Sequence, residues 1–421
     1  MSNQDPRIYL SQGRFHRSVR CPRTQQLVTF GLVGDWSEEY NNRNAVPSSS
    51  TQDDRVILFV LPSGCLRYVA ILLDGILKAS KRRMIAIDRP GAGGTPPCER
   101  IDRMQLSTKH TLSVLEYMHI DRVDILTHSA GWFYALNLIA TSPSLFLRKN
   151  ETSKWIFCSP FVPTHISGSF LSILPKSVIG LAPQAGSALN YIGKAFSWSV
   201  TSLPDNAIWS KDEEMEELMR GGKKTAEQEQ KDDKKREQSK IKYSKARFHP
   251  PYRTHRFFGL DQWKKEAAVA RTKKPSLSLS DVRPKHPRTQ RAMKSADELW
   301  MDYMTMENVM KAATEDFLFC LGKVEGMNNE TLDQWTQEKL SAIAQLVKDT
   351  QGSSIESRTV WGDNDLFIPQ KGKTYLAKIL EKEWSSKEGI TVKDWIMAES
   401  GHDSPLASRE VVEAMIEFYG E

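Results

Sequence analysis

A serine, an acid and a histidine each follow a predicted strand, in that order along the chain, and these residue types can perform nucleophilic catalysis. Ser129 comes after the apolar run at 123–126, with Thr127 before it and Gly131 after it. Small residues on both flanks suit a sharp strand-to-helix turn. The pattern is close to G-x-S-x-G, with Thr in place of the first Gly. Five residues alone also fit an ordinary serine in a turn, so the rest of the chain must distinguish a catalytic serine from this alternative.

The acid and the histidine stand at later strand ends. Asp363 and Asp365 follow a predicted strand at 357–361, and His402 follows another at 392–397. The carboxyl ends of parallel strands share one edge of a sheet, so these side chains should gather near the serine. A serine hydroxyl is a poor nucleophile at neutral pH unless a base takes its proton. The imidazolium that then forms needs a fixed anion behind it.

Apolar runs that alternate with helical stretches predict the elements that position these residues. The predicted buried strands are 55–61, 83–88, 123–126, 154–158, 357–361 and 392–397, and the predicted helices are 68–79, 102–118, 332–348, 369–380 and one from 408. Before them, 14–20 and 25–32 alternate apolar and polar residues, as antiparallel strands do. The pattern predicts an α/β protein with a mostly parallel central sheet and helices on both faces.

The alternation stops after residue 162 and resumes at 330. We therefore expect one α/β core built from 1–162 and 330–421, interrupted by a largely helical insertion at 163–329. The part at about 211–294 is highly charged. Its run 211–245 has almost no large apolar residues, so it has too little apolar surface to bury for stable order.

Three further parts of the insertion admit different interpretations. The segment His165–Trp198 carries two charges, and either lid helices packed on the core or a lipid-facing surface would fit it. Aromatic residues lie among the basic residues of Arg247–Lys294, but no nucleic-acid motif accompanies them, which favours a solvated insertion. Asp297–Leu321 is most simply one amphipathic helix that covers the core or a pocket.

Charge and cysteine usage exclude several classes of protein. The net charge is +6, but the segment Lys245–Lys294 alone holds fourteen Lys/Arg against three Asp/Glu, so the basic character is local. Five scattered cysteines without a C-x-x-C pair argue against a zinc site or disulfide framework and fit a reducing compartment. No apolar run reaches the roughly 18 residues of a spanning helix. We expect an intracellular, cytoplasmic protein, although the Arg-rich start also fits a mitochondrial presequence.

Several motifs taken together resemble the α/β-hydrolase superfamily of serine hydrolases. The match covers about 1–162 and 330–421 and includes the turn around Ser129, the turn Asp88-Arg-Pro-Gly-Ala-Gly, and Gly401-His402. Ser, Asp and His in that order along the chain are also typical of these enzymes. The resemblance implies an α/β-hydrolase fold, with 163–329 as a lid inserted at the usual place.

The resemblance also implies a role for each residue. Ser129 would be the nucleophile, His402 the general base and then acid, and Asp365 the orienting carboxylate. The oxyanion hole would use the backbone N–H groups of Ala130 and Ser63.

The chain departs from the family pattern beside the nucleophile. Most members have His-Gly where this chain has Leu61-Pro62, and proline has no N–H to donate. The second oxyanion donor is therefore Ser63 or Gly64. Asp363 competes with Asp365 as the orienting acid, and the spacing from Asp365 to Pro369 favours Asp365. His128 is interpreted as a packing or pocket residue, and Asp88 as a structural turn residue.

The expected activity is hydrolysis of an ester or related acyl bond in a hydrophobic small molecule, through an acyl-enzyme. No metal, organic cofactor or nucleic acid is expected, and the lid could contact a membrane surface or lipid. The same residues would also serve hydrolysis of a carbon–carbon bond. A non-catalytic binding or scaffold protein that kept the fold is the alternative, motivated by the altered loop and the basic insertion.

Overall fold

A nine-stranded sheet runs through the part of the chain that the computed structural model describes, namely residues 5–45, 55–169, 247–250, 252, 285, 293–307, 310–323, 328–385 and 387–420. The strand order is β1-β2-β4-β3-β5-β6-β8-β9-β7. Only β2 (Leu27–Gly34) pairs antiparallel, with β1 (Arg17–Arg20) and β4 (Arg83–Ile87), among the strands described. The predicted mostly parallel sheet is confirmed.

The other strands alternate with helices along the two core segments. The strands are β3 (Val56–Val60), β5 (Val123–His128), β6 (Thr152–Cys158), β8 (Ser354–Gly362), β9 (Ile390–Met397) and the edge strand β7 (Arg247–Phe248). The α-helices are α1 (Pro6–Leu10), α2 (Asp74–Ala79), α3 (Arg103–Tyr117), α4 (Gly131–Thr141), α5 (Thr164–Ser167), α12 (Ala296–Met306), α13 (Met310–Cys320), α14 (Asn329–Asp349), α15 (Gln370–Leu380), α16 (Ser404–Ala407) and α17 (Arg409–Gly420). Short helical turns are η1 (Gly13–Phe15), η2 (Glu38–Asn41), η3 (Arg67–Leu73), η4 (Pro143–Leu145) and η6 (Glu381–Ser385).

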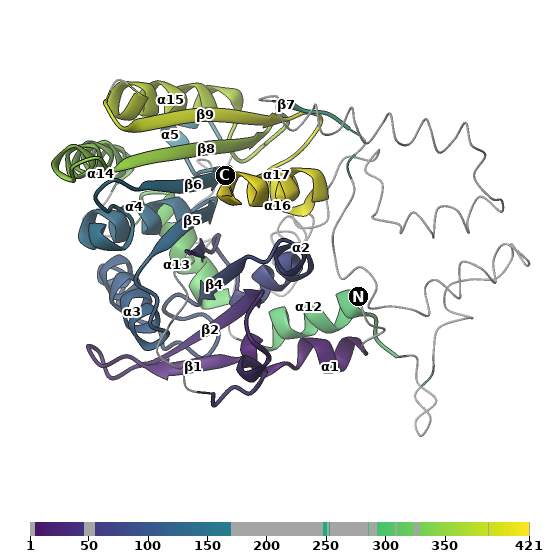
Figure 1. Cartoon of the computed structure of the whole chain (residues 1–421). Helices are drawn as coiled ribbons and strands as arrows, with labels where there is room; N and C mark the ends of the chain where they lie inside the picture. The colour runs from purple at the N-terminus through teal and green to yellow at the C-terminus, as the bar shows by residue number, and fades with distance from the viewer. Residues whose placement is uncertain are drawn as a thin grey trace, which may run out of the picture.

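Apolar layers cover both faces of the sheet, which explains the continuous apolar runs in the sequence. Successive side chains of a strand point to opposite faces. Ile125 of β5 accordingly packs in the cluster that contains α3, α4, α14 and α15, whereas Leu126 packs in the cluster that contains α2 and α17. Figure 1 shows α3, α4 and α14 on one side of the sheet, and α2 and α17 on the other.

The predicted helix at 68–79 is instead a 3-10 turn, η3, followed by α2. The change of helix type falls at Asp74, the first residue of α2, whose carboxylate is completely buried. This carboxylate accepts hydrogen bonds from Arg14 at 2.6 and 2.7 Å and from the Gly34 N–H at 2.6 Å. Helix periodicity alone does not reveal this change, because the partners of Asp74 come from β2 and from the segment before β1.

The predicted helix at 297–321 is also divided, into α12 and α13. Helix α12 ends at Met306, and Glu307 adopts an extended backbone (φ −91°, ψ 150°). Its carboxylate accepts hydrogen bonds from the buried Arg67 at 2.7 and 2.8 Å. This ion pair with the core favours a bend that the amphipathic pattern of 297–321 does not indicate.

Most of the 163–329 insertion lies outside the described residues, including 170–246. The interpretations of His165–Trp198 beyond residue 169, of the run 211–245 and of most of the basic segment therefore concern residues that are not described. The described parts of the insertion form α5, β7, α12 and α13. Strand β7 has two residues, too few for a periodic pattern. None of the described helices has both the length and the apolar character needed to cross a membrane.

Candidate active site

Ser129 occupies a sharp turn between β5 and α4, in a backbone conformation that is rare for a residue with a side chain. Its φ is +50°. Such a conformation costs on the order of 1–3 kcal/mol and persists only where neighbouring structure enforces it. Here the Ser129 N–H donates to the Cys158 carbonyl at 3.0 Å, and the Ser129 carbonyl accepts from the Trp132 and Phe161 N–H groups, both at 3.3 Å. The turn leaves Ser129 half-buried at the carboxyl end of β5.

Close backbone packing explains the small residue after the turn. A Cβ atom on Gly131 would lie 2.2 Å from the Val60 carbonyl oxygen and 2.6 Å from that of Leu61. Helix α4 therefore begins directly against the end of β3, and only glycine fits there. Thr127, which replaces the first glycine of the motif, pairs with Val60 in the sheet and is fully buried.

Asp365 and His402 lie together at the ends of β8 and β9. The Asp365 carboxylate accepts from the Phe367 and Ile368 N–H groups through Oδ1, at 2.8 and 2.9 Å. Its Oδ2 lies 2.7 Å from Nδ1 of His402. The Asp365 side chain is completely buried, and that of His402 is 9% exposed. The two backbone bonds orient the carboxylate so that its second oxygen faces the imidazole.

The Asp365 carboxylate and the His402 imidazole each stabilise the charged form of the other. Burial alone would raise the pKa of Asp365, but His402 and the backbone donors hold that pKa below its usual value. Burial likewise disfavours the charged form of His402, but the Asp365 carboxylate raises the pKa of the imidazole above its usual value near 6.5. An ionised carboxylate accepts hydrogen bonds only, so Nδ1 of His402 carries a proton in the neutral ring and Nε2 has the free lone pair.

Asp363, the competing acid, faces other groups. Its Oδ1 accepts from the Ser400 N–H at 3.2 Å, and its Oδ2 lies 3.5 Å from the Arg247 guanidinium. The geometry therefore joins Asp365, and not Asp363, to the histidine. No hydrogen bond joins the Ser129 hydroxyl to His402 within the described residues; in free enzymes such bonds are often long and tighten when substrate binds.

His128, interpreted as a packing residue, contacts the loop that carries His402. Its Nε2 lies 3.2 Å from the His402 carbonyl oxygen and 3.1 Å from Asp403 Oδ1, and the two imidazole rings meet edge-on at 4.9 Å. Burial lowers the pKa of His128 to about 4, so the ring is neutral at physiological pH. Ser159 Oγ donates to the same carbonyl at 2.8 Å. These contacts attach the His402 loop to the residue that precedes Ser129.

His128, His402 and Asp403 form a group that could hold a metal ion. Ligand atoms of His128, His402 and Asp403 lie within 4.8 Å of one another. Nδ1 of His402 already pairs with Asp365, so a metal ion would bind Nε2. His402 could then not act as a base.

The loop after β3 and the start of α4 present backbone donors without partners. Among the described residues, the N–H groups of Ser63, Gly64 and Ala130 make no hydrogen bond. Ser63 is 6% exposed and Ala130 is 1% exposed. Buried N–H groups are rarely unpaired, so unpaired donors beside Ser129 are suited to receive a negatively charged oxygen.

Asp88 has structural contacts, and its neighbour Arg89 is the residue that the sequence-based interpretation missed. Asp88 accepts hydrogen bonds from Thr29 Oγ1 at 2.6 Å and the Arg67 N–H at 2.7 Å. Arg89 is buried and donates to the carbonyl oxygens of Leu61 and Pro62. The sequence signal for Arg89 was its place in the Asp88-Arg-Pro-Gly turn, directly after a buried strand.

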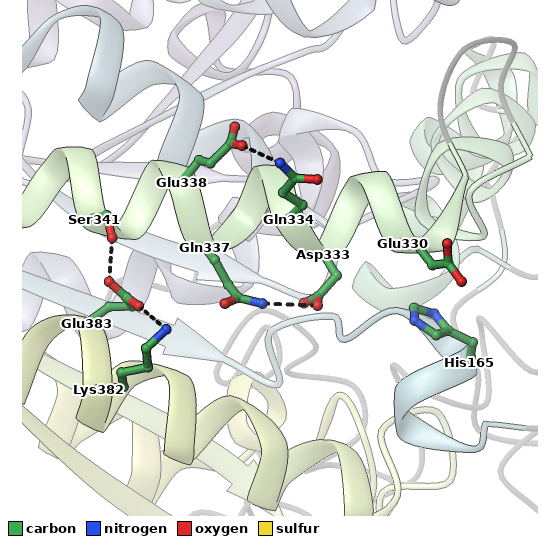
Figure 2. A pocket seen from close by; sticks show the side chains of 9 residues that line it. All are labelled: His165, Glu330, Asp333, Gln334, Gln337, Glu338, Ser341, Lys382 and Glu383. Atoms are coloured by element: carbon green, nitrogen blue, oxygen red, sulfur yellow. Dashed lines mark hydrogen bonds and ion pairs between the residues drawn. The ribbon is translucent and has the colours of Figure 1, made fainter.

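A polar groove of about 580 Å³ between α14 and η6 contains none of these residues (Figure 2). Several of its side chains are paired with one another. Examples are Ser341 with Glu383, and Gln337 with Asp333 at 3.1 Å. His165 and Glu330 line its far end. Among the described residues, its one serine, Ser341, is bound to a carboxylate and has no contact with a histidine, so the groove lacks the serine–histidine–acid arrangement of the candidate catalytic site.

Comparisons with known proteins give similarities of fold alone. No protein family and no curated protein matches the sequence. Solved structures that resemble the chain include a serine hydrolase from Cycloclasticus zankles (13% identity, 94% of each chain covered, TM-score 0.44). An enol-lactonase from Burkholderia xenovorans LB400 is 9% identical over 96% of this chain and all of its own (TM-score 0.45). An epoxide hydrolase from Vigna radiata is 14% identical over 96% of each chain (TM-score 0.44).

The topology of this chain is itself diagnostic. The sheet is parallel apart from β2, the strand order crosses from β4 through β3 to β5, and a residue with positive φ follows β5. This is the topology expected of the α/β-hydrolase fold, so the fold that the sequence resembles is confirmed.

Proposed function

We propose that this protein is a serine hydrolase that cleaves an ester or related acyl bond through an acyl-enzyme, with Ser129, His402 and Asp365 as its catalytic triad. The observation that carries the proposal is the buried 2.7 Å contact between Asp365 and His402, at the sheet edge where Ser129 occupies its strained turn. A nucleophile, a base and an orienting acid are the three groups that this reaction needs.

The reaction proceeds in two steps, acylation of Ser129 and hydrolysis of the acyl-enzyme. His402 Nε2 takes the hydroxyl proton of Ser129 as Oγ bonds to the substrate carbonyl carbon, and the Ser63 and Ala130 N–H groups stabilise the oxyanion. The carbon–oxygen bond to the leaving group then breaks, and His402 returns the proton to that group. A water molecule, deprotonated by His402, attacks the acyl-enzyme and releases the acid and Ser129. Asp365 stays ionised and stabilises the imidazolium in each step.

An aromatic side chain beside the triad supports a hydrophobic acyl group in the substrate. Phe367 is half-buried, and the centroid of its ring lies 5.1 Å from that of the His402 ring. Apolar surface with a few polar groups is typical of small-molecule sites. The ester and its acyl chain are therefore the substrate class that we propose.

Labelling with a fluorophosphonate probe tests this function, because the probe phosphonylates a serine that a base has activated. The parent protein should be labelled at one site, and Ser129→Ala should not be labelled. Ser341→Ala is the matched control, since Ser341 lies in the polar groove between α14 and η6 that contains none of the triad residues, and it should be labelled like the parent. Equal labelling of Ser129→Ala, or no labelling of the parent, would exclude Ser129 as the nucleophile and favour a non-catalytic binding protein.

The pH dependence of kcat/KM should show one acid limb that belongs to His402. The base must be neutral, so kcat/KM should fall about tenfold per pH unit as the pH drops below the raised pKa of His402, which lies above 6.5. His128 stays neutral down to a pKa of about 4, so His128→Gln should leave the midpoint of the limb in place. A limb below pH 6, or one that disappears in His128→Gln, would contradict this assignment.

A further inference from the structure

Arg89 lies beneath the loop that follows β3 and binds two of its carbonyl groups. Its Nη1 donates to the Leu61 carbonyl, and its Nη2 donates to the Pro62 carbonyl at 2.6 Å. The residue is 6% exposed. The loop also lies against the nucleophile turn, because the Leu61 carbonyl is one of the two atoms that leave no space for a Cβ on Gly131.

The Pro62 carbonyl belongs to the same peptide unit as the Ser63 N–H. In a planar trans peptide the C=O and N–H bonds point in opposite directions. The guanidinium that holds the carbonyl on one side therefore directs the Ser63 N–H to the other side. A charged donor on the carbonyl also polarises the peptide and makes its N–H a stronger donor.

Asp316 of α13 holds Arg89 in this position. Its Oδ2 lies 2.5 Å from Nη2 and 3.1 Å from Nε of Arg89, and its Oδ1 accepts from Arg103 Nε and Tyr134 Oη, both at 2.8 Å. Asp316 is 1% exposed, and Arg103 is 2% exposed. One carboxylate thus fixes two buried arginines, and the strong geometric preference of the guanidinium for such pairing leaves little freedom to Arg89.

We propose that Arg89 is a positioning residue for the oxyanion hole, and that Asp316, supplied by the inserted segment, keeps it in place. The inference rests on the proposed function and extends it. It is compatible with the departure at Leu61-Pro62: proline contributes no N–H, so the donor belongs to the next peptide, and Arg89 holds that peptide through the Pro62 carbonyl. Docking of α13 on the core is then required for a complete oxyanion hole.

Two variants test the proposal against a matched control. Arg89→Lys keeps the charge but loses the fork that reaches two carbonyls. Asp316→Asn keeps the shape of the side chain but loses its charge. The control is Glu307→Gln, which weakens another ion pair between the inserted segment and the core, with Arg67 at 2.7 Å, and touches neither Leu61 nor Pro62. All three are assayed below their melting temperatures with p-nitrophenyl esters and with a trifluoromethyl ketone, which forms an oxyanion adduct on the serine.

We expect Arg89→Lys and Asp316→Asn to lower kcat about 10- to 100-fold with KM within about threefold, because loss of an oxyanion donor costs roughly 10²–10³ and misorientation costs part of that. Affinity for the ketone should fall by a similar factor, and Glu307→Gln should keep both values.

A loss in kcat no larger than that of Glu307→Gln, or a loss in kcat with unchanged affinity for the ketone, would overturn the inference. If Asp316→Asn does not fold, the kcat and ketone affinity of Arg89→Lys test the proposal by themselves. Failure of the parent protein to react with the fluorophosphonate would instead overturn the proposed function itself.

Discussion

Replacing Asp365 by asparagine should lower kcat roughly 10⁴-fold and leave KM nearly unchanged. The reason lies in the two oxygens of the side chain. Oδ1 accepts from two backbone N–H groups, so the asparagine carbonyl oxygen would occupy that side and its NH₂ group would face His402. Nδ1 must then accept instead of donate, which places the ring proton on Nε2 and abolishes the base. Steady-state hydrolysis of a p-nitrophenyl ester measures the effect.

Asp363→Asn is the matched control for this prediction. The amide can keep the hydrogen bond from the Ser400 N–H, and the contact to Arg247 is long, at 3.5 Å, on a side chain that is 29% exposed. Partly exposed ion pairs contribute little, so kcat should stay within about fivefold of the parent. A large loss in Asp363→Asn with a small one in Asp365→Asn would assign the orienting acid to Asp363.

Gly131→Ala should destabilise the fold by about 3 kcal/mol and also impair catalysis. The added Cβ would lie 2.2 Å from one backbone carbonyl oxygen and 2.6 Å from another, and no side-chain rotation relieves a clash with backbone. Either α4 or the end of β3 must move. Such a shift would displace Ser129 relative to the loop that holds Ser63. Urea unfolding measures the loss of stability, and fluorophosphonate labelling measures the loss of reactivity.

Gly31→Ala provides the comparison for Gly131→Ala. A Cβ on Gly31 of β2 would meet its nearest atom, the Phe15 carbonyl oxygen, at 3.5 Å, which is ordinary van der Waals contact. Its free energy of unfolding should change by less than about 1 kcal/mol. Equal stabilities of the two variants would show that the approach of α4 to β3 can relax, contrary to the close packing inferred for this turn.

The core elements could be predicted because their signals are local. Within the predicted strands, 56–61 and 84–87 are apolar at every position, as expected of strands that are covered on both faces. Helix α3 and strand β8 formed where periodicity or apolar character predicted them, with ends shifted by a few residues. The divided helices at 68–79 and 297–321 were missed, because Asp74 and Glu307 take their partners from distant parts of the chain.

The candidate site was predictable to the same extent. Parallel strands place their carboxyl ends on one edge of the sheet, so the sequence alone predicted that the residues after β5, β8 and β9 lie near one another. The small residues around Ser129 predicted a sharp turn there, and Ser129 has the positive φ that such a turn demands.

The parallel core and the three strand ends where Ser129, Asp365 and His402 lie could be predicted from the sequence alone, because strand patterns and turn residues act over short distances. Which acid faces the histidine depends on the folded structure, since Asp363 and Asp365 differ in the backbone groups that orient them. Only the tertiary structure joined Arg89 to Asp316, 227 positions further along the chain. Such pairs depend on how the insertion packs against the core, and no local pattern encodes them.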